Sequence, residues 1–224
     1  MALSSYMMQE LMKRVRPGQR IASLGYPDII ITPDEVSGIV GNVSLKYLGK
    51  EVSKRHNVNY LIPEAVHFFK TLGIELDVYD VVKERGCEII CDLNFPINSL
   101  KDYDVVIDVG TMEHCFNIGQ AMMNMASLVK LNGFILHENP YNWGNHGFYN
   151  LNPTLFTDFY EQNGFELLSC ILIESKEKTV NQAPRTERFL INGGECNLIT
   201  VAQRKEIKEF TYPIQTKYKK LLGE

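Results

Sequence analysis

The hydrophobic pattern of the chain alternates short apolar runs with longer segments in which apolar residues recur every three or four positions. The short runs are typical of buried strands and the longer segments of amphipathic helices. Strands are predicted within residues 20–31, 73–80, 88–91, 105–107, 134–136, 165–173 and 197–204, and helices within 6–16, 63–72, 118–129 and 152–163. This order predicts a doubly wound, Rossmann-like α/β fold with a mostly parallel, seven-stranded sheet and one antiparallel strand near the edge.

The segment from Tyr103 to Asn117 is the centre of this pattern. The apolar run Val105 to Ile107 is too short for a helix, and the polar residues Asp108 to His114 follow directly where the strand should end. Open α/β sheets bind their ligands outside the carboxyl ends of their strands, so a binding site is predicted here. Asn117 is a suitable N-cap for the following helix, and Asn132-Gly133 is expected to stop that helix.

The length of 224 residues suits one domain, 1–224, better than two. Two segments exceed what the predicted connections need: an insertion at about residues 33–59 and a polar loop insertion at about 174–195. The first is either a lid near the mouth of the predicted binding site or a packing elaboration, and the sequence supports both equally. A methionine-rich stripe in the first helix is typical of core packing.

The composition of the chain excludes some classes of function. Hydrophobic residues make up 45% of the chain, charged residues 22%, and the formal net charge is −4, which does not fit a general nucleic-acid binder. The amino-terminal residues 1–16 are interrupted by charges, so neither a signal peptide nor a membrane span is expected, and the default location is the cytoplasm. The five cysteines lack the spacing of a zinc site and are expected to be reduced thiols.

Two motifs carry a family resemblance. Residues 110–117 read Gly-Thr-Met-Glu-His-Cys-Phe-Asn, residues 146–149 read His-Gly-Phe-Tyr, and Lys130 to Gly133 forms a turn after the helix. Together they resemble the class I S-adenosylmethionine-dependent methyltransferases, and more narrowly a bacterial branch of that family. The resemblance implies a methyltransferase whose cofactor is S-adenosylmethionine.

The resemblance also implies a cofactor site along the strand ends. Most such enzymes have a glycine-rich turn after the first strand, whereas here only Gly25 remains, followed by Tyr26. An acid after the second strand would hold the ribose hydroxyls, with Asp77 the better match and Asp80 the second choice. The remaining residues expected near the cofactor are Asp92 and Leu93, which would contact the adenine, and Gly110.

Histidines near the predicted strand ends suggest the catalytic chemistry. A base with a pKa near neutrality assists methyl transfer to a hydroxyl or amine, and His146 is the first candidate, with His114 second. The loop after the next strand is rich in amides and aromatic rings, and His137, Asn139, Asn142 and Tyr149 are expected to bind the acceptor. No required metal is expected, because Gly110 stands where quinone-pathway O-methyltransferases carry the first glutamate of a metal-binding run.

The leading hypothesis is therefore a methyltransferase acting on a small polar acceptor such as a sugar or a sugar-linked group. The alternative is a methyltransferase-like fold that has lost catalysis and serves as a binding or assembly module, suggested by the thin glycine content of the first turn. A nicotinamide oxidoreductase is third, because Gly-x-Gly-x-x-Gly is absent. No nucleic-acid or membrane partner is expected, and a homo-oligomer is left open.

Overall fold

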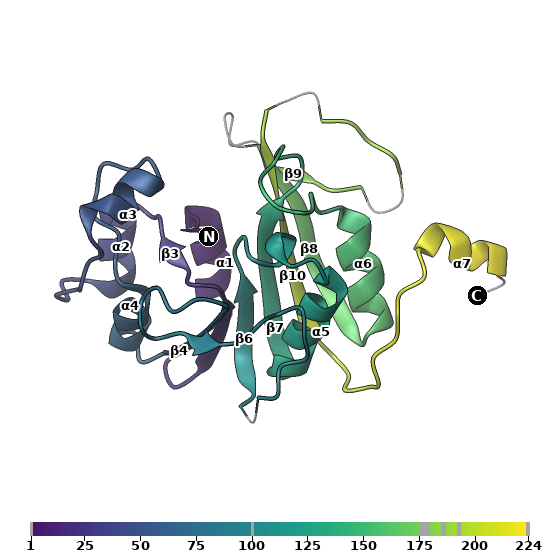
Figure 1. The fold of residues 1–224 in the computed structure, drawn as a ribbon, viewed down its shortest axis with the longest axis horizontal. Coiled ribbons are helices and arrows are strands. Elements are labelled where there is room, and N and C mark those ends of the chain that lie inside the picture. The colour runs from purple at the N-terminus through teal and green to yellow at the C-terminus, as the bar shows by residue number, and fades with distance from the viewer. Residues whose placement is uncertain (1, 100, 175–179, 185–186, 192–193, 223–224) are drawn as a thin grey trace.

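A central parallel strand, β6 (Tyr103–Asp108), lies within an eight-stranded sheet in the computed structural model (Figure 1). The structure describes residues 2–99, 101–174, 180–184, 187–191 and 194–222. The strand order is β5-β4-β2-β6-β7-β10-β8-β9. The other strands are β2 (Arg20–Leu24), β4 (Glu75–Asp80), β5 (Ile89–Ile90), β7 (Val129–Pro140), β8 (Phe165–Glu174), β9 (Val180–Gln182) and β10 (Cys196–Arg204).

The mostly parallel character of the sheet agrees with the prediction, but the number of strands does not. The first five strands of the order run parallel, and β10 lies antiparallel between β7 and β8. The prediction of seven strands was wrong because β9, from the segment expected to be a polar loop, adds an eighth, antiparallel strand to the edge of β8. A separate two-stranded sheet pairs β1 (Ala2–Leu3) with β3 (Asp28–Ile29).

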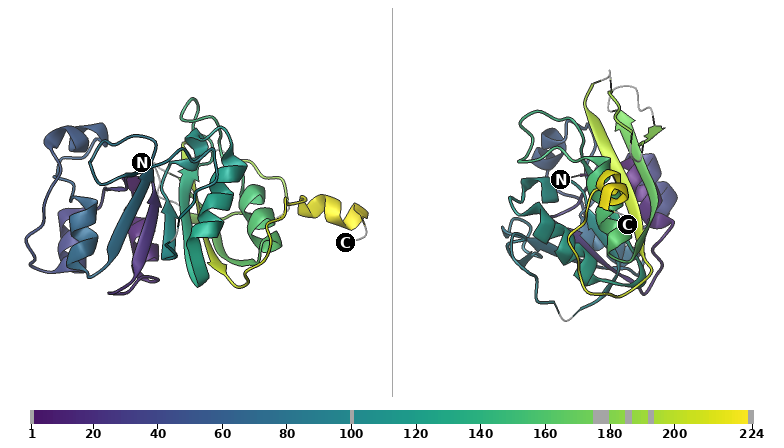
Figure 2. Two further views of the ribbon diagram at one scale, coloured as in Figure 1. Left: turned by 60° about the horizontal axis from the view of Figure 1, so that its bottom comes forward. Right: turned by 90° about the vertical axis from the view of Figure 1, so that its right-hand side faces the viewer.

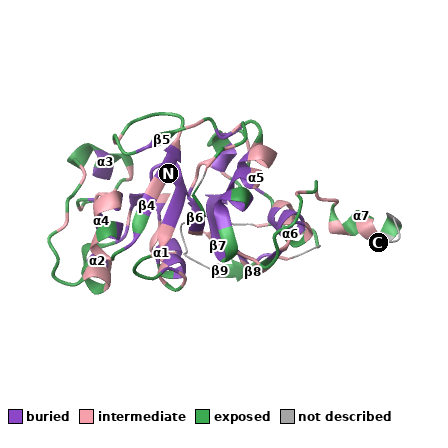
Figure 3. Ribbon diagram, turned by 90° about the horizontal axis from the view of Figure 1, so that it is seen from below, coloured by how far each residue is buried: buried purple, intermediate pink, exposed green. Residues whose placement is uncertain are grey.

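Helices cover both faces of the sheet, as a doubly wound fold requires. One core contains the apolar residues of α1 (Ser5–Met12), α2 (Pro33–Val40) and α4 (Ala65–Thr71), and the other contains those of α5 (Ile118–Leu128) and α6 (Pro153–Gln162). Val105 and Ile107 belong to the first core and Val106 to the second, so β6 is buried on both sides (Figure 3). The short helix α7 (Thr216–Leu222) projects away from this body (Figure 2).

Capping residues set the helix positions largely as the sequence indicates. The side chain of Asn117 accepts a hydrogen bond from the backbone of Gln120 and begins α5, and Asn152 caps α6 in the same way. The expected stop at Asn132-Gly133 was wrong: α5 already ends at Leu128, where Val129 turns to extended backbone, and Asn132-Gly133 lies within β7. The chain therefore passes from helix to strand without a loop.

The segment from Pro33 to Asn59 contains α2 and a further short helix, α3 (Lys50–Arg55). Its end is held to the body by the buried Asp28, whose carboxylate lies 2.8 Å from His56 Nε2 and 3.3 Å from Arg85 Nη2. This contact fixes the insertion against the loop after β4. Within the described part of the chain, no helix has both the length and the apolar character of a membrane span.

Candidate functional site

The carboxyl ends of neighbouring strands form one edge of the sheet at which polar side chains gather. The strand register places Tyr79 of β4 beside Leu24 of β2, Leu24 beside Asp108 of β6, and Asp108 beside His137 of β7. A 3-10 turn, η1 (Met112–His114), follows β6 directly. Because open α/β sheets bind ligands outside these strand ends, this edge is the candidate functional site.

Asp108 is the fully buried anchor of the edge. Its Oδ1 accepts hydrogen bonds from the backbone N–H groups of Thr111 and Met112, at 3.0 and 3.1 Å. Its Oδ2 accepts from Asn139 Nδ2 at 2.8 Å and lies 3.1 Å from His137 Nδ1. One carboxylate thus fixes both the turn after β6 and two side chains of β7.

His137 uses both ring nitrogens inside the protein. The Asp108 carboxylate can only accept, so Nδ1 carries the hydrogen, and Nε2 accepts from the Tyr160 hydroxyl at 2.5 Å. Burial, with the charge of Asp108, raises the pKa of Tyr160 well above its usual value, which keeps this donor protonated. His137 has no exposed surface. His137 therefore supports the site from the protein interior, through its contacts with Asp108 and Tyr160. This is contrary to the prediction that it binds the acceptor.

Asn139 is buried as well, because β7 extends to Pro140 and pairs this residue with Leu198 of β10. Its Nδ2 donates to Asp108 Oδ2 and, at 3.0 Å, to Glu113 Oε2. The amide thus separates two carboxyl groups and supplies a donor to each. The prediction of Asn139 as an acceptor-binding residue was wrong for the same reason as that of His137.

Glu113 combines complete burial with an incomplete set of partners. Its Oε1 lies 3.5 Å from His146 Nε2 and makes no hydrogen bond with any described residue. Burial, reinforced by the charge of Asp108, raises the pKa of Glu113 to about 8. Such a carboxyl group is stabilised either by a proton or by a nearby cation.

The two histidines predicted to be catalytic lie together beside Glu113. The rings of His114 and His146 are 5.2 Å apart, and partial burial together with the His146 ring lowers the pKa of His114. One ligand atom from each of Glu113, His114 and His146 lies within 4.8 Å of the others. The site therefore presents one carboxylate and two imidazoles to a common point.

The loop from Tyr141 to Asn150 is held tightly against η1. The backbone N–H groups of Phe148 and Tyr149 donate to the Glu113 carbonyl oxygen at 2.9 and 3.3 Å. A Cβ atom at Gly147 would lie only 2.8 Å from the same oxygen, so the loop can approach this closely because residue 147 is glycine. The ring of Trp143, 5.4 Å from that of His146, completes the support.

The other two predicted acceptor residues remain nearer the surface. Asn142 is exposed and bonds through its amide to the backbone of Gly194 and Cys196, at 3.1 and 2.7 Å. Tyr149 is half-buried, and its hydroxyl donates to the Phe116 carbonyl at 2.9 Å. Both residues stay predictions for acceptor contact.

On the side predicted to bind the cofactor, two glycines turn the chain at neighbouring strand ends. Gly25 follows β2 with a φ of 72°, and Gly110 follows β6 with a φ of 87°, a backbone conformation that favours glycine. The N–H of Gly25 donates to the Tyr79 carbonyl at 2.7 Å, which directs the turn across the end of β4. Both predicted glycines thus lie on the candidate edge.

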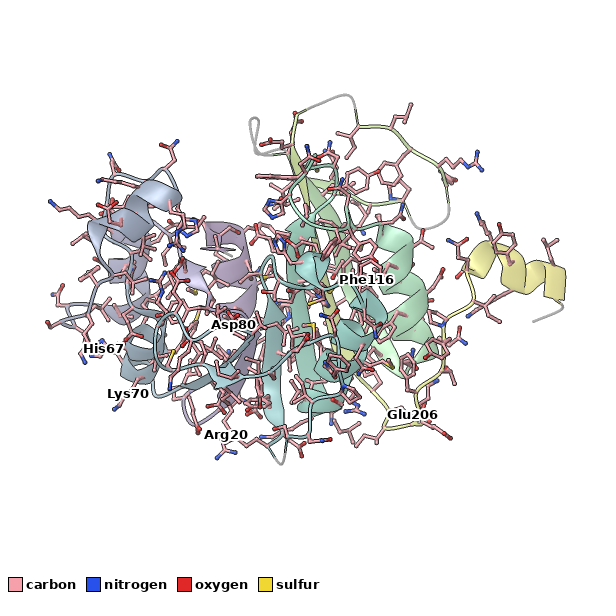
Figure 4. All side chains as sticks on the ribbon, viewed as in Figure 1. Arg20, His67, Lys70, Asp80, Phe116 and Glu206 are labelled. Atoms are coloured by element: carbon pink, nitrogen blue, oxygen red, sulfur yellow. The ribbon has the colours of Figure 1, made fainter. Side chains whose placement is uncertain are left out.

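The structure separates the two acids considered for the ribose. Asp77 lies in the middle of β4, opposite Ala22, and its carboxylate bonds to the Tyr103 hydroxyl and to Lys101 Nζ, both at 2.7 Å. Asp80 is the last residue of β4 and reaches the candidate edge. Figure 4 labels Asp80 together with Phe116, which precedes α5. Asp80, the second choice for the ribose, therefore lies nearer the candidate edge than Asp77, which is three positions before the strand end.

Tyr26, Asp92 and Leu93 differ in their surroundings. The Tyr26 hydroxyl is already bonded to Glu64 and to the backbone of Ala65, and its ring is buried. Asp92 is exposed in the turn after β5, and Leu93 beside it is buried. The structure therefore leaves Asp92 accessible and gives Tyr26 a supporting contact at the start of α4.

A cavity of about 1090 Å³ is lined by Tyr141 and by residues that follow the Tyr141 to Asn150 loop. It lies between the start of α6, Pro184, residues 187–190 and residues of the segment 213–217, and Tyr141 stacks on Phe189 in its wall at 5.7 Å. The residues lining it do not include Gly25, Asp80 or Glu113. The cavity is thus separate from the cofactor side.

Sequence reasoning left open whether Glu113 braces its loop or contacts a ligand, and it missed the role of Tyr160. Glu113 stood within the recognised Met-Glu-His run, but only the folded loop brings His146 to its carboxylate. Tyr160 gave no signal beyond its place on the apolar face of α6. The partner of each residue comes from a distant part of the chain, which no local pattern indicates.

The chain matches no family model and no curated protein, whereas many solved structures share its fold. A putative S-adenosylmethionine-dependent methyltransferase from Listeria monocytogenes is 12% identical, with a TM-score of 0.51, and the match covers 88% of this chain and 97% of that one. The N-methyltransferase NodS from Bradyrhizobium japonicum WM9, in complex with S-adenosyl-L-homocysteine, is 10% identical with a TM-score of 0.50, over 91% and 89% of the two chains.

TehB from Haemophilus influenzae is 11% identical with a TM-score of 0.46, and the match covers 90% of this chain. The chain spans only 63% of the length of TehB. At these identities the comparisons establish the fold, which is the Rossmann-like fold of class I methyltransferases.

Proposed function

We propose that the chain is an S-adenosylmethionine-dependent methyltransferase acting on a hydroxyl or amine of a small polar acceptor. One observation carries the proposal: the Gly25 turn and Asp80 lie on one side of the buried Asp108 cluster, and Glu113 with His146 lies on the other. The edge thus has one half suited to a nucleoside and another suited to proton removal. The fold shared with known methyltransferases supports this assignment.

The residues of the first half fit the cofactor. A carboxylate with two acceptor oxygens suits the vicinal hydroxyls of a ribose, and we assign this role to Asp80. Asp92 is accessible to accept from the adenine amino group, Leu93 supplies an apolar contact, and the Gly25 and Gly110 turns offer backbone without side chains. When bound, S-adenosylmethionine supplies an electrophilic methyl group on a sulfonium.

The second half supplies orientation and a proton acceptor. His146 projects from the loop that Gly147 and Phe148 hold against η1, so its ring has a defined position beside the strand ends. If no metal ion is bound here, His146 is the residue placed to take the proton from the acceptor, and His114 lies beside it. Holding the two reactants in line accounts for most of the expected rate enhancement.

The surface around His146 supports a polar acceptor with some apolar area. Asn142 and Tyr149 offer amide and hydroxyl groups, and the exposed rings of Phe116 and Phe148 meet edge to face at 5.7 Å. Sugars combine several hydroxyls with apolar ring faces. A sugar or sugar-linked acceptor is therefore our choice within the broader class.

Calorimetry with S-adenosylmethionine and S-adenosyl-L-homocysteine tests the cofactor assignment first. Both should bind the wild-type protein and the His146→Ala variant with similar affinity. Release of S-adenosyl-L-homocysteine in the presence of a panel of sugars, small alcohols and amines then tests the reaction, and His146→Ala should lower turnover about a hundredfold. His67→Ala, which removes a histidine on α4, is the matched control and should keep full turnover.

Two outcomes would change the proposal. If neither compound bound, the cofactor assignment would be wrong. If both bound and no acceptor in a broad panel were methylated, a binding or assembly module would become the better assignment of function.

A further inference from the structure

We propose that Glu113, His114 and His146 form a binding site for a divalent first-row transition-metal ion, with Zn²⁺ as the representative. The three side chains each offer a ligand atom, and these atoms lie within 4.8 Å of one another. In a tetrahedral zinc site with bonds of about 2.0 to 2.1 Å, neighbouring ligand atoms are about 3.3 to 3.4 Å apart. The separation of 3.5 Å between Glu113 Oε1 and His146 Nε2 is close to this value.

The state of Glu113 is the independent observation that points to a cation. Its side chain has no exposed surface, and its Oε1 has no hydrogen-bond partner among the described residues although it faces His146. Leaving a carboxylate oxygen buried and unpartnered is costly. A metal ion between Oε1 and the two imidazoles would give this oxygen a partner and would balance the negative charge of the Asp108 cluster.

The surroundings hold the proposed ligands in place. Asn139 Nδ2 donates to Glu113 Oε2 at 3.0 Å, which holds the carboxylate with its Oε1 facing His146. The bonds from Phe148 and Tyr149 to the Glu113 carbonyl position the loop that carries His146. Hydrogen bonds of this kind commonly tune metal affinity by orienting the ligands. His114 is exposed, and its ligand atom lies within 4.8 Å of those of Glu113 and His146.

The donor set indicates the kind of metal. Two imidazoles and one carboxylate suit Zn²⁺, Fe²⁺ and neighbouring ions, whereas Mg²⁺ and Ca²⁺ prefer oxygen ligands. Three protein ligands leave at least one position open for another molecule. The sequence led to the opposite expectation because Gly110 lacks a ligand, but His146 from a different loop provides the third donor.

The role of the ion rests on the proposed function, whereas its binding does not. A hydroxyl of the acceptor would occupy the open position, and the ion would lower its pKa so that the proton leaves to solvent. The acceptor oxygen would then form a bond to the methyl carbon as the bond from that carbon to sulfur breaks. His146 would act as a ligand in this case and not as the free base.

Metal titration of the chelator-treated protein tests the site directly. Calorimetry with Zn²⁺ and visible absorption with Co²⁺ should both report one saturable site per chain that weakens about tenfold or more in His114→Ala and in His146→Ala. Both variants change exposed side chains and should stay folded, which circular dichroism checks. His67→Ala is the matched control and should bind the ions as the wild type does.

The chain has five free cysteines, and thiols also bind Zn²⁺. The histidine variants are therefore needed to distinguish binding at the proposed site from binding at a cysteine. If the affinity for both ions were the same in His114→Ala, His146→Ala and the wild type, the bound metal would lie elsewhere and the proposal would be wrong. The absence of any saturable site would overturn it as well. These readouts need no cofactor, so they separate this proposal from the methyltransferase assignment, and full methyl transfer by the chelator-treated protein would overturn only the ion's catalytic role.

Discussion

The Nε2 atom of His146 lies 3.5 Å from the Oε1 atom of Glu113, although the imidazole is 40% exposed and the carboxyl group is completely buried. The loop that carries His146 is fastened to the Glu113 backbone by two hydrogen bonds. The interior of the protein thereby sets the position of an exposed side chain. Chemistry at His146 should depend on residues that never touch a ligand.

Replacing Gly147 with alanine should disturb this arrangement while leaving the imidazole and the carboxyl group chemically unchanged. The new Cβ would lie 2.8 Å from the Glu113 carbonyl oxygen and 3.0 Å from its Cγ, so the loop must move outward. We expect methyl transfer to fall at least about tenfold, because a displacement near 1 Å can cost a hundredfold. The measurement is turnover with a responsive acceptor.

Gly144→Ala in the same loop is the matched control, because its new Cβ would have no heavy atom within 4 Å. This variant should keep its activity. Equal activity of the two variants would show that contact with the Glu113 backbone does not position the catalytic loop.

The two acids of β4 should separate cofactor binding from stability. Asp80→Ala removes the carboxylate at the strand end and should weaken S-adenosyl-L-homocysteine binding by about 1.5 to 3 kcal/mol, as expected for a hydrogen bond to a charged group. Asp77→Ala should leave this affinity unchanged and lower the melting temperature, because Tyr103 and Lys101 lose their partner. Calorimetry and thermal unfolding on both variants make the comparison, and the reverse pattern would return the ribose role to Asp77.

The hydroxyl of Tyr160 should matter mainly for stability. Tyr160→Phe leaves the buried Nε2 of His137 without its donor, and such a loss typically costs about 1 to 3 kcal/mol. Urea unfolding measures the change. Tyr60→Phe is the control: its hydroxyl donates to the Ile30 carbonyl from a half-buried position and should cost less than Tyr160→Phe. An equal or smaller loss in Tyr160→Phe would mean that water replaces the phenol.

Much of the fold could be predicted because its strands are short apolar runs with clear ends. The run Val105 to Ile107 is buried on both sides, and Asn117 caps the next helix, both as predicted. The strand β9 could not be predicted in this way. Its polar sequence carries no burial pattern, and it forms a strand because its backbone pairs with the exposed edge of β8.

The candidate site was predictable only where motif and strand end coincide. His114 and His146 were identified and do lie together. His137 and Asn139 were misplaced because a strand of three predicted residues became twelve, which moved both side chains from a loop into the sheet. Asp77 was preferred because Leu76-Asp77 resembles a pair in the family, although the predicted strand 73–80 already ended at Asp80, as β4 does. The boundaries of β7 were harder to predict. Such boundaries depend on neighbouring strands, which the local sequence does not contain.

Glu138 gives a prediction for the dependence of stability on pH. Its carboxyl group is buried, and this burial raises its pKa above the usual value even though Ser4 and Asn197 donate hydrogen bonds to it. A group with a raised pKa in the folded state contributes stability that is fully present below its unfolded pKa. That contribution is lost as the pH rises through the folded pKa. Each unit of elevation corresponds to about 1.4 kcal/mol.

Glu138→Gln should remove this loss, because an amide of the same shape stays neutral at every pH. The free energy of unfolding of the variant, measured with urea from about pH 4 upward, should therefore fall less steeply with rising pH than that of the wild type. Glu51→Gln on the exposed side of α3 is the control and should reproduce the wild-type slope. If Glu138→Gln kept that slope too, the Glu138 carboxylate would be ionised in the folded protein at no net cost, with its two hydrogen bonds offsetting its burial.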